Sequence, residues 1–515
     1  MKVLSYTSGI LLITAGITTN CANSEKNTSG VEKKQMNVIF ILSDDHRYDF
    51  MGFTGKVPWL ETPNMDKMKN EGVFFPNAFV TTSLCSPSRA SILTGLYSHS
   101  HTVVDNHSPD PGNLIFFPEY LQEAGYETSF FGKWHMGSED DSPQPGFDHW
   151  ESFKGQGVYY GPELNINGLN KKYDSSVYIS DLLTEHAIHW MENRNREKPF
   201  FMYLSHKAAH GGFEPARRHF GKYSDEAIEL PLSFHTSAEK ITGKSLSTCK
   251  DDITPLSGSE YYGPGRTPDW QKMQRESWHG VDYMYHGRQC LEDIYKRYCE
   301  TLLGVDESIG RVLDYLEKNN LTNSTMVIYM GDNGFAFGEH GLIDKRHFYE
   351  ESVKVPFLIY APGFAPSGKV IDKLTQNIDI APTILDVAGV FKPNQMQGMS
   401  LIPLISGKEV EWRDRIFYEY YWEYDFPQTP TMHGVRTDRY KLIRYHGIWD
   451  TNEFYDLEND PNETINLIAS PEHQNLIKEL SNEIYDWLEE SNGMSIPLKR
   501  TVKFRFGDHR NPDTY

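Results

Sequence analysis

The sequence predicts an α/β fold: a central, mostly parallel sheet sandwiched by helices, with a smaller C-terminal α+β subdomain carrying an antiparallel sheet. Two observations lead to this prediction. Short, continuous apolar runs recur along the chain, and such runs are typical of strands buried on both faces of a parallel sheet. Segments with apolar residues at helical spacing lie between them, and this alternation is the pattern of an α/β sandwich.

Five apolar runs are expected to form strands of the central sheet. They are NVIFIL (37–42), TSFF (128–131), PFFMYL (199–204), MVIYM (326–330) and VPFLIY (355–360). Three segments between them are expected to be helices, at 117–126, 177–194 and 299–320. Residues 37–410 are therefore predicted to form one catalytic domain.

The C-terminal part has a different pattern, and we assign residues 411–515 to the smaller α+β subdomain. Short strand-and-turn segments come first, and one amphipathic helix is expected at 472–491. Residues 230–285 lack periodicity and are rich in Gly, Ser, Pro and aromatic residues. A long irregular stretch of this kind is either a functional loop or a disordered one.

Composition limits the classes of function. The chain of 515 residues has 38% hydrophobic residues and a net charge of −21. This charge disfavours binding to nucleic acids or to anionic membranes, although a local basic pocket stays compatible with it.

The N-terminus predicts export. Lys2 is followed by an apolar run to about Ile17, which is too short to span a bilayer and suits a secretory signal peptide at 1–21. Cys21 follows this run, so a lipid anchor on Cys21 and an unlipidated exported protein stay open as alternatives. Residues 22–36 are polar and are expected to be a linker. We expect a periplasmic protein or an outer-membrane or cell-surface lipoprotein, with membrane contact through that anchor alone.

Five cysteines are spread along the chain, without a CxxC pair or zinc-type spacing. Cys290 and Cys299 are either core residues or one disulfide, and the sequence does not decide between these alternatives.

Charged and polar residues follow four of the expected strands. Because the carboxyl ends of parallel strands lie along one edge of a sheet, and open α/β sheets bind ligands at that edge, these residues are expected to share one crevice. They are Asp44 and Asp45, Lys133 and His135, Lys207 and His210, and Asp332 and Asn333.

Four of these residues offer oxygen ligands, namely Asp44, Asp45, Asp332 and Asn333. Hard cations such as Ca²⁺ or Mg²⁺ prefer such a set, whereas zinc favours His and Cys. Solvated turns or helix caps are the alternative for each motif alone. Together with Lys133, His135, His210 and Lys345, a cation here would form a site for a compact anion, although His210 could equally be structural.

Cys85 begins the stretch CSPSRASILTG, in which Pro87 suits the first turn of a helix and Arg89 lies one turn after the cysteine. A low-pKa thiolate nucleophile is one reading, since a helix N-terminus favours a negative group. A soft thiolate is a poor partner for a hard cation, however, and an oxygen nucleophile fits better.

These motifs resemble the type I sulfatases of the alkaline phosphatase superfamily. CSPSRASILTG resembles the signature in which the cysteine is oxidised to formylglycine (3-oxoalanine) by a maturation enzyme, and SDD, GKWH, KAAH, GDNG and DKR follow in the family's order. The resemblance covers most of residues 37–450. It implies an alkaline phosphatase-like fold and sulfate ester hydrolysis with one Ca²⁺ per chain, Mg²⁺ being the weaker alternative.

The resemblance also implies roles for individual residues. Modified Cys85 would be the nucleophile and a metal ligand beside Asp44, Asp45, Asp332 and Asn333. Arg89 and Lys133 would hold the formylglycine hydrate, and His135 would act as the base. His210 and Lys345 would bind the sulfate and protonate the leaving alcohol.

Two other functions are alternatives to sulfate ester hydrolysis. Phosphodiester or phosphonate monoester hydrolysis uses a similar site, and a non-enzymatic glycan-binding lipoprotein could keep the fold. The presence of Cys85 and of every Asp ligand disfavours the glycan-binding lipoprotein.

The expected substrate is a sulfated poly- or oligosaccharide. An algal polysaccharide such as ulvan is the first choice, and glycosaminoglycans with 6-sulfated glucosamine are the second. The residues expected to contact sugar are His46, Lys207, His340, Arg346, His433 and Arg436.

Overall fold

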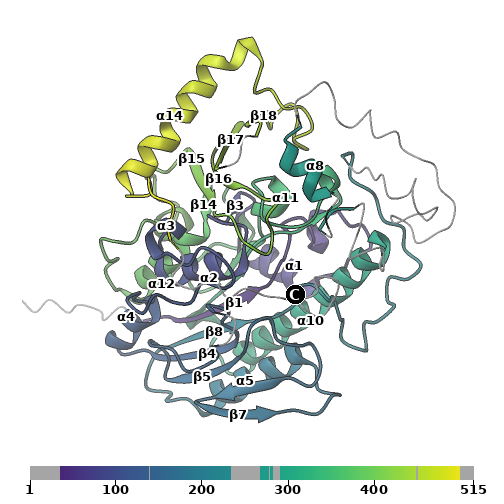
Figure 1. Ribbon diagram of the computed structural model, residues 1–515. Helices are drawn as coiled ribbons and strands as arrows, with labels where there is room; N and C mark the ends of the chain where they lie inside the picture. The colour runs from purple at the N-terminus through teal and green to yellow at the C-terminus, as the bar shows by residue number, and fades with distance from the viewer. Residues whose placement is uncertain are drawn as a thin grey trace, which may run out of the picture. The chain divides into compact units, whose positions relative to one another are not determined.

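The central sheet of the computed structural model has ten strands in the order β13-β2-β12-β9-β1-β8-β4-β5-β6-β7. Its neighbouring strands β1, β8, β4 and β5 are labelled one below another in Figure 1. Their bounds are β1 Asn37–Ser43, β2 Val73–Phe74, β4 Glu127–Lys133, β5 His149–Phe153, β6 Glu163–Ile166, β7 Leu169–Lys172, β8 Phe200–Ser205, β9 Thr325–Gly331, β12 Phe357–Tyr360 and β13 Lys369–Val370. The middle of the sheet is parallel, because β9, β1, β8, β4 and β5 pair in parallel, whereas β12 and β6 pair antiparallel with it.

The structure describes residues 35–137, 140–233, 267–275, 277, 279–281, 290–447 and 450–498. The expected signal peptide with Cys21, nearly all of the expected linker and most of the 230–285 stretch lie outside the described residues. The described residues, from Gln35 onward, belong to a single compact unit.

Side chains of β1 alternate between two apolar cores, which explains why its sequence is continuously apolar. Val38, Phe40 and Leu42 pack into the core on one face of the sheet. Ile39 and Ile41 pack into the core on the other face. Both faces of the strand are therefore buried, as predicted for a sheet with helices on both sides.

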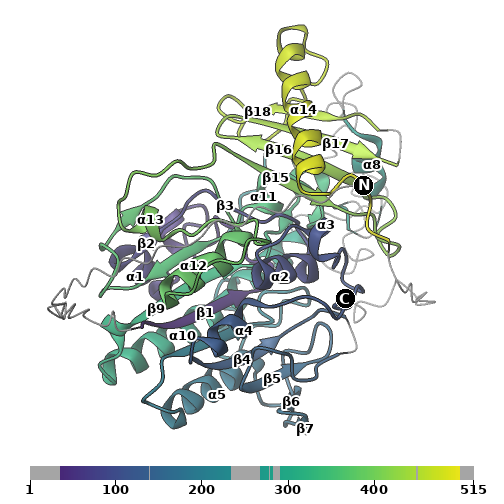
Figure 2. The same cartoon turned by 90° about the vertical axis from the view of Figure 1, so that its left-hand side faces the viewer.

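Helices cover both faces of the sheet: Figure 1 shows one layer of helices on each side of it, and Figure 2 looks onto one of these layers. One layer contains α1 (Pro63–Glu71), α5 (Ile179–Asn193) and α10 (Leu291–Lys318), whose buried residues join the core of Ile39. The other contains α2 (Cys85–Thr94), α4 (Phe117–Glu123) and α12 (Ile380–Ala388), whose buried residues join the core of Val38. The predicted α/β sandwich is confirmed.

The C-terminal part forms a second, antiparallel sheet, as predicted. Its strands are β15 (Arg415–Tyr420), β16 (Thr431–Thr437), β17 (Tyr440–His446) and β18 (Glu453–Asp456), paired in that order. Helix α14 (Gln474–Glu490) packs on one face of this sheet through Leu480 and Ile484. The short helix α11 (Glu350–Val353) is tied to the same sheet by ion pairs from β16 and β17. The expected boundary at 410/411 falls in the loop before β15.

All five expected strands are present, and three details differ from the prediction. The strand at 355–360 begins at Phe357 and runs antiparallel to β9. The helix expected from 299 begins earlier, at Leu291. A helix, α8 (Asp269–Arg275), lies inside the stretch that was expected to be irregular.

The two neighbouring cysteines do not pair with one another. Cys299 is a free, buried thiol on α10, and Cys290 is disulfide-bonded. Of the two alternatives left open by the sequence, the Cys290–Cys299 disulfide is therefore wrong, and Cys299 is a core residue.

Candidate active site

The polar residues after four strands do meet at one edge of the central sheet. Ser43, the last residue of β1, pairs with Gly331 of β9, and Leu42 pairs with Ser205 of β8. In β4, Gly132 pairs with the same Ser205. The residues that follow these strand ends all lie within the buried part of the protein: Asp44, Asp45, Lys133, His135, Lys207, His210, Asp332 and Asn333.

Helix α2 delivers Cys85 and Arg89 to this edge. Cys85 is the first residue of the helix and is fully buried. Arg89, one turn later, donates to Asp332 Oδ2 from Nε at 2.9 Å and lies within hydrogen-bonding distance of the Lys133 carbonyl oxygen (2.7 Å) and of Ser205 Oγ (2.6 Å). The guanidinium thus fastens the helix to three strand ends and neutralises one carboxylate.

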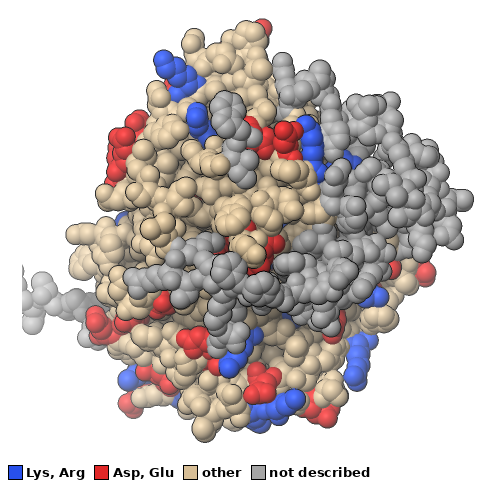
Figure 3. All heavy atoms as spheres, viewed as in Figure 1, with Lys and Arg blue, Asp and Glu red and all other residues tan. Residues whose placement is uncertain are grey.

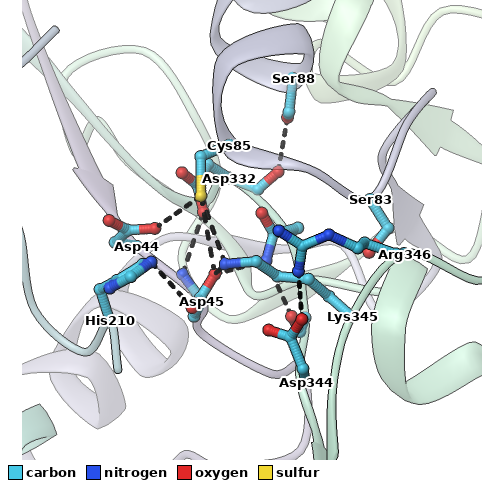
Figure 4. Close-up of polar contacts among 12 residues, drawn as sticks. Asp44, Asp45, Ser83, Cys85, Ser88, His210, Asp332, Asp344, Lys345 and Arg346 are labelled. Carbon is cyan, nitrogen blue, oxygen red and sulfur yellow. Dashed lines mark hydrogen bonds and ion pairs between the residues drawn. The ribbon is translucent and has the colours of Figure 1, made fainter. Parts of the chain in front are cut away.

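Three carboxylates lie close together beside the cysteine. Oxygen atoms of Asp44, Asp45 and Asp332 lie within 4.8 Å of one another, and Cys85 Sγ is 3.4 Å from Asp44 Oδ1 (Figure 4). Asp45 has a left-handed φ of 52°, which turns the chain sharply after β1. Its backbone N–H donates to Asp332 Oδ1 at 3.0 Å. The turn therefore brings two consecutive carboxyl groups to the same point.

The donor set fits a hard divalent cation. Three carboxylates and one amide supply oxygen ligands, the chemistry that Ca²⁺ and Mg²⁺ prefer. Asn333 donates from Nδ2 to Asp45 Oδ1 at 2.7 Å, while its Oδ1 is buried without a hydrogen-bond partner among the described residues. A buried acceptor without a partner is costly, and a cation would satisfy it. The acidic cluster can therefore hold a metal ion.

Cationic side chains balance these carboxylates. Lys133 is paired with Asp44, and Lys345 is paired with Asp45. Burial alone would raise the pKa of Asp44, but Lys133, His210 and Arg89 lower it well below its usual value. Burial raises the pKa of Asp45, and Lys345 opposes this effect. The two adjacent carboxyl groups therefore occupy different electrostatic environments.

The surroundings of Cys85 do not favour a thiolate. Burial raises the pKa of its thiol, and the charge of Asp44 adds to that effect. Lys133 and Lys345 oppose the rise without reversing it. The unmodified side chain is therefore a protonated thiol, and the reading of Cys85 as a low-pKa nucleophile gains no support.

Two histidines flank the acidic cluster. His210 Nε2 lies 3.9 Å from Asp45 Oδ2, and in the described part of the chain no group hydrogen-bonds to its buried Nδ1. His135 has a left-handed φ of 58°, and its Nδ1 lies 3.4 Å from Ser86 Oγ, next to Cys85. Burial lowers the pKa of both rings well below the usual value, so both are neutral and able to accept a proton.

Lys207 lies at the same edge, and three residues that the sequence did not single out support the site. Lys207 Nζ lies 4.6 Å from the centre of the Tyr159 ring, and burial lowers its pKa to about 8. Tyr159 also donates to the carbonyl oxygen of His210 at 2.6 Å. Gln156 Oε1 accepts from Lys133 at 2.6 Å, and Ser205 contacts Arg89. Ser205 directly follows the strand expected at 199–204 and ends β8, whereas Gln156 and Tyr159 carry no sequence signal.

Arg346 lies beside Lys345, as Figure 4 shows. It is paired with Asp344, and its Nε lies 2.9 Å from Glu423 Oε1. Its guanidinium lies 3.5 Å from the centre of the Phe426 ring. The structure therefore brings Arg346 to the site with the other residues of DKR.

Four residues that we expected to contact sugar are buried, and each contacts a neighbouring side chain of the protein. His46 bonds to Tyr329 OH at 2.5 Å, and His340 stacks on a tyrosine ring. His433 packs against Trp487 of α14, and Arg436 pairs with Glu350 of α11. Because β16 is covered on both faces, its polar side chains are buried whichever way they point. These contacts favour structural roles for all four residues, and sugar contact by His46, His340, His433 and Arg436 stays a prediction.

Acidic and basic side chains are interspersed on the face seen in Figure 3, where the visible Lys and Arg do not form one continuous patch. Within the described part of the chain, the helices are too short or too polar to cross a bilayer.

Comparison with known proteins identifies the family. The family model described as Sulfatase matches residues 36–390, and a second, described as N-sulphoglucosamine sulphohydrolase, C-terminal, matches residues 338–490. The chain therefore belongs to the sulfatase family, whose solved relatives have the alkaline phosphatase fold, and it is a sulfuric ester hydrolase.

Two individual relatives are similar to the chain along most of its length. The chain is 35% identical to an N-acetylglucosamine-6-O-sulfatase of Bacteroides thetaiotaomicron, over 98% of this chain and 95% of that protein. It is 29% identical to the human N-acetylglucosamine-6-sulfatase, over 75% of this chain and 67% of that protein.

Solved structures agree with this result. A protein in complex with its substrate D-glucosamine-2-N,6-O-disulfate has a TM-score of 0.76 and 33% identity, over 90% of this chain and 99% of that one. A phosphonate monoester hydrolase of Agrobacterium radiobacter has a TM-score of 0.67 at 20% identity, over 89% of this chain and 96% of that one, which shows a shared fold.

Proposed function

We propose that this protein is an exported sulfatase that removes the 6-O-sulfate of glucosamine residues in glycosaminoglycan saccharides. The observation that carries the proposal is the 35% identity, along nearly the whole chain, to a sulfatase named for N-acetylglucosamine 6-sulfate. The relative solved with a glucosamine disulfate points to the same sugar. Of the two substrate classes weighed from the sequence, these findings favour glycosaminoglycans over ulvan.

The nucleophile of the proposed reaction is Cys85 after conversion to formylglycine. In formal terms a maturation enzyme must supply a two-electron oxidant, because Cβ exchanges its sulfur, released as sulfide, for a carbonyl oxygen from water. The aldehyde then adds water to give a geminal diol. An oxygen nucleophile suits the hard oxygen donors around Cys85 better than the protonated thiol does.

We assign the metal to Asp44, Asp45, Asp332 and Asn333, with the modified Cys85 as a further ligand. Ca²⁺ is the proposed ion, because a set of carboxylate and amide oxygens without His or Cys in thiolate form suits it. When bound, the ion would supply positive charge that acidifies the diol and neutralises sulfate oxygens.

In the first step, one diol oxygen loses its proton to solvent water and attacks sulfur, and the bond from sulfur to the sugar oxygen breaks. The departing alcohol takes a proton from Lys345, which is paired with Asp45, while the neutral ring of His210 on the other side of Asp45 binds the sulfate. Lys133 and Lys345 offset charge on the sulfate oxygens, and Arg89 with Lys133 holds the diol. The sulfate is now esterified to the former aldehyde carbon.

In the second step, His135 removes the proton of the remaining hydroxyl group. The carbonyl bond re-forms, the bond from carbon to the sulfate oxygen breaks, and sulfate leaves. His135 suits this role because its ring is neutral and lies beside Ser86, the residue next to Cys85. A serine at position 85 lacks the second hydroxyl group and would stop after the first step.

Sugar recognition is proposed for residues beside the sulfate position. Arg346 follows Lys345 directly and presents a planar set of donors, and Lys207 lies near Asp44 and Asp45. The N-terminal segment is proposed to direct export, with lipidation at Cys21 or release as a soluble protein as its two outcomes.

A panel of substrates tests the proposal. Defined saccharides sulfated at position 6, 4 or 2 of the sugar, an ulvan oligosaccharide, an aryl sulfate and an aryl phosphonate would be compared by kcat/KM. Highest activity on 6-sulfated glucosamine is expected, together with an aldehyde or its hydrate at Cys85 by peptide mass spectrometry. A preference for the aryl phosphonate would instead favour the phosphonate monoester hydrolase alternative.

A further inference from the structure

The backbone of α11 connects two loops of the active site. The carbonyl oxygen of Ser352 accepts a hydrogen bond from the Gly334 N–H at 2.8 Å and a second from Ser83 Oγ, also at 2.8 Å. Gly334 directly follows Asn333, and Ser83 lies two residues before Cys85. One carbonyl group therefore joins the loop of a proposed metal ligand to the loop of the nucleophile.

The contact with α11 requires a close backbone approach at Gly334. A Cβ atom at this position would lie 2.1 Å from the carbonyl oxygen of Glu351, well inside contact distance. The same carbonyl accepts the N–H of Phe335 at 2.9 Å. A movement of α11 would therefore be transmitted directly to the backbone of residues 333–335.

Ion pairs from the C-terminal sheet hold the other side of α11. Glu350 lies 3.2 Å from Arg436 Nε, on β16, and 2.8 Å from Lys441 Nζ, on β17. Lys441 also lies 2.8 Å from Glu463 Oε1 and donates to the Phe348 carbonyl oxygen at 2.7 Å. Two cations and two carboxylates thus clamp the start of α11.

This cluster is buried, so water does not weaken it. The side chain of Lys441 is 0% exposed, and that of Glu350 is 9% exposed. Removing one partner of a buried ion pair leaves the other charge uncompensated, which is strongly destabilising. The remaining charges would shift to find partners, and α11 would shift with them.

We propose that Glu350 is a positioning residue for sulfate ester hydrolysis: held by Arg436 and Lys441, it fixes α11 and thereby the loops of Asn333 and Cys85. The C-terminal sheet therefore helps to position the residues of the active site. The inference rests on the proposed function, since it takes Asn333 as a metal ligand and Cys85 as the nucleophile.

The test compares Glu350→Gln, which removes the charge at constant shape, with Glu350→Asp, which keeps the charge. In Glu350→Gln, kcat on an aryl sulfate is expected to fall about tenfold, because small misplacements of reacting groups cost much of the rate. KM should change less. The Ca²⁺ concentration that gives half of the thermal stabilisation should rise. Glu350→Asp should recover part of both losses, and formylglycine content is measured in each sample.

Asp456→Asn is the matched control. Asp456 of β18 pairs at 2.7 Å with Arg439, in the turn between β16 and β17, and among the described residues it makes no hydrogen bond or ion pair with α11. This variant should lower Tm while leaving kcat and the Ca²⁺ response at wild-type values. The comparison separates a general loss of stability from a loss of positioning.

Wild-type kcat and Ca²⁺ response in folded Glu350→Gln would overturn the inference. If that variant does not fold, Ser352→Ala decides, because it removes a hydroxyl group 2.5 Å from Ser83 Oγ without touching the ion pairs. A lower kcat in Ser352→Ala would support positioning by α11, and an unchanged kcat would contradict it. Failure of the proposed function would look different, since the wild type itself would then lack sulfatase activity or a Ca²⁺ response.

Discussion

The ammonium group of Lys345 lies 3.3 Å from Cys85 Sγ and is paired with Asp45 at the same time. One cation therefore contacts both the nucleophile's position and the acidic cluster. In the proposed reaction this places a positive charge where the sulfate oxygens and the leaving alcohol meet, so Lys345 can offset charge as it develops.

Lys345→Ala is expected to lower kcat about 100-fold, the usual size of the effect when a group that stabilises transition-state charge is removed. Aryl sulfate hydrolysis under single-turnover and steady-state conditions measures the change. Lys222→Ala, at a surface ion pair with Glu61, is the control and should retain wild-type kcat. Equal activity in both variants would remove Lys345 from the mechanism.

Asn333→Ala is expected to weaken Ca²⁺ binding, because it removes a buried amide oxygen of the cluster to which none of the described residues donates a hydrogen bond. The rise in Tm on adding Ca²⁺ to chelator-treated protein measures this directly, without reference to activity. Asn333→Asp should keep binding, since it retains an oxygen ligand. A Tm that responds equally to Ca²⁺ in the wild type and in Asn333→Ala would rule out this ligand assignment.

The sequence predicted which charged residues meet at one edge of the sheet, because their positions depend on local patterns. Apolar runs such as 37–42 identify buried strands, and parallel strands must present their following residues at one edge. Asp44 and Asp332 are 288 positions apart in sequence, yet both could be placed from the strand that precedes each of them. Cys85 was found through the motif around it.

Contacts made by the C-terminal sheet could not be predicted in this way. The sequence shows that β16 alternates side chains, but it does not show that α14 and α11 cover its two faces. His433 and Arg436 therefore looked like rim residues, although one packs on α14 and the other pairs with Glu350. Gln156 and Tyr159 were missed because irregular loops carry no pattern that reports their neighbours.

His433→Ala is expected to lower stability without changing selectivity. The ring is 4% exposed and packs against Trp487, and its removal leaves a cavity in the core beneath α14. Tm should fall, while the ratio of kcat/KM on 6-sulfated glucosamine to that on an aryl sulfate should stay at the wild-type value. A change in this ratio would return His433 to the sugar-binding surface.

Asp344→Asn is expected to reduce stability at neutral pH and to bring the variant and the wild type closer as the pH falls. Burial alone would raise the pKa of Asp344, but Arg346 and His279 lower it to about 2 from 3.8. A carboxyl group with a depressed pKa stabilises the fold above its unfolded value, and this contribution disappears as the pH falls through the folded value. The shift corresponds to about 2 kcal/mol.

Thermal unfolding of both proteins between pH 7 and pH 3 measures the effect. The difference in Tm should be constant down to about pH 4 and should shrink below it. A difference that stays constant through the acidic range would show that the ionised form of Asp344 is not what stabilises the fold.

Arg346→Lys is expected to separate sugar recognition from sulfate chemistry. Arginine presents a planar fork of donors beside Lys345, and lysine keeps the charge but loses the fork. Losing a buried hydrogen bond to substrate costs about 1–3 kcal/mol, so kcat/KM on 6-sulfated glucosamine should fall about tenfold to 100-fold. An aryl sulfate has no sugar hydroxyl groups to lose contact with, and its turnover should change less. Arg413→Lys, at the buried pair of Arg413 with Asp379, controls for the general cost of replacing a buried arginine. Equal losses of kcat/KM on both substrates would show that Arg346 supports the loop of Lys345 and does not contact the sugar.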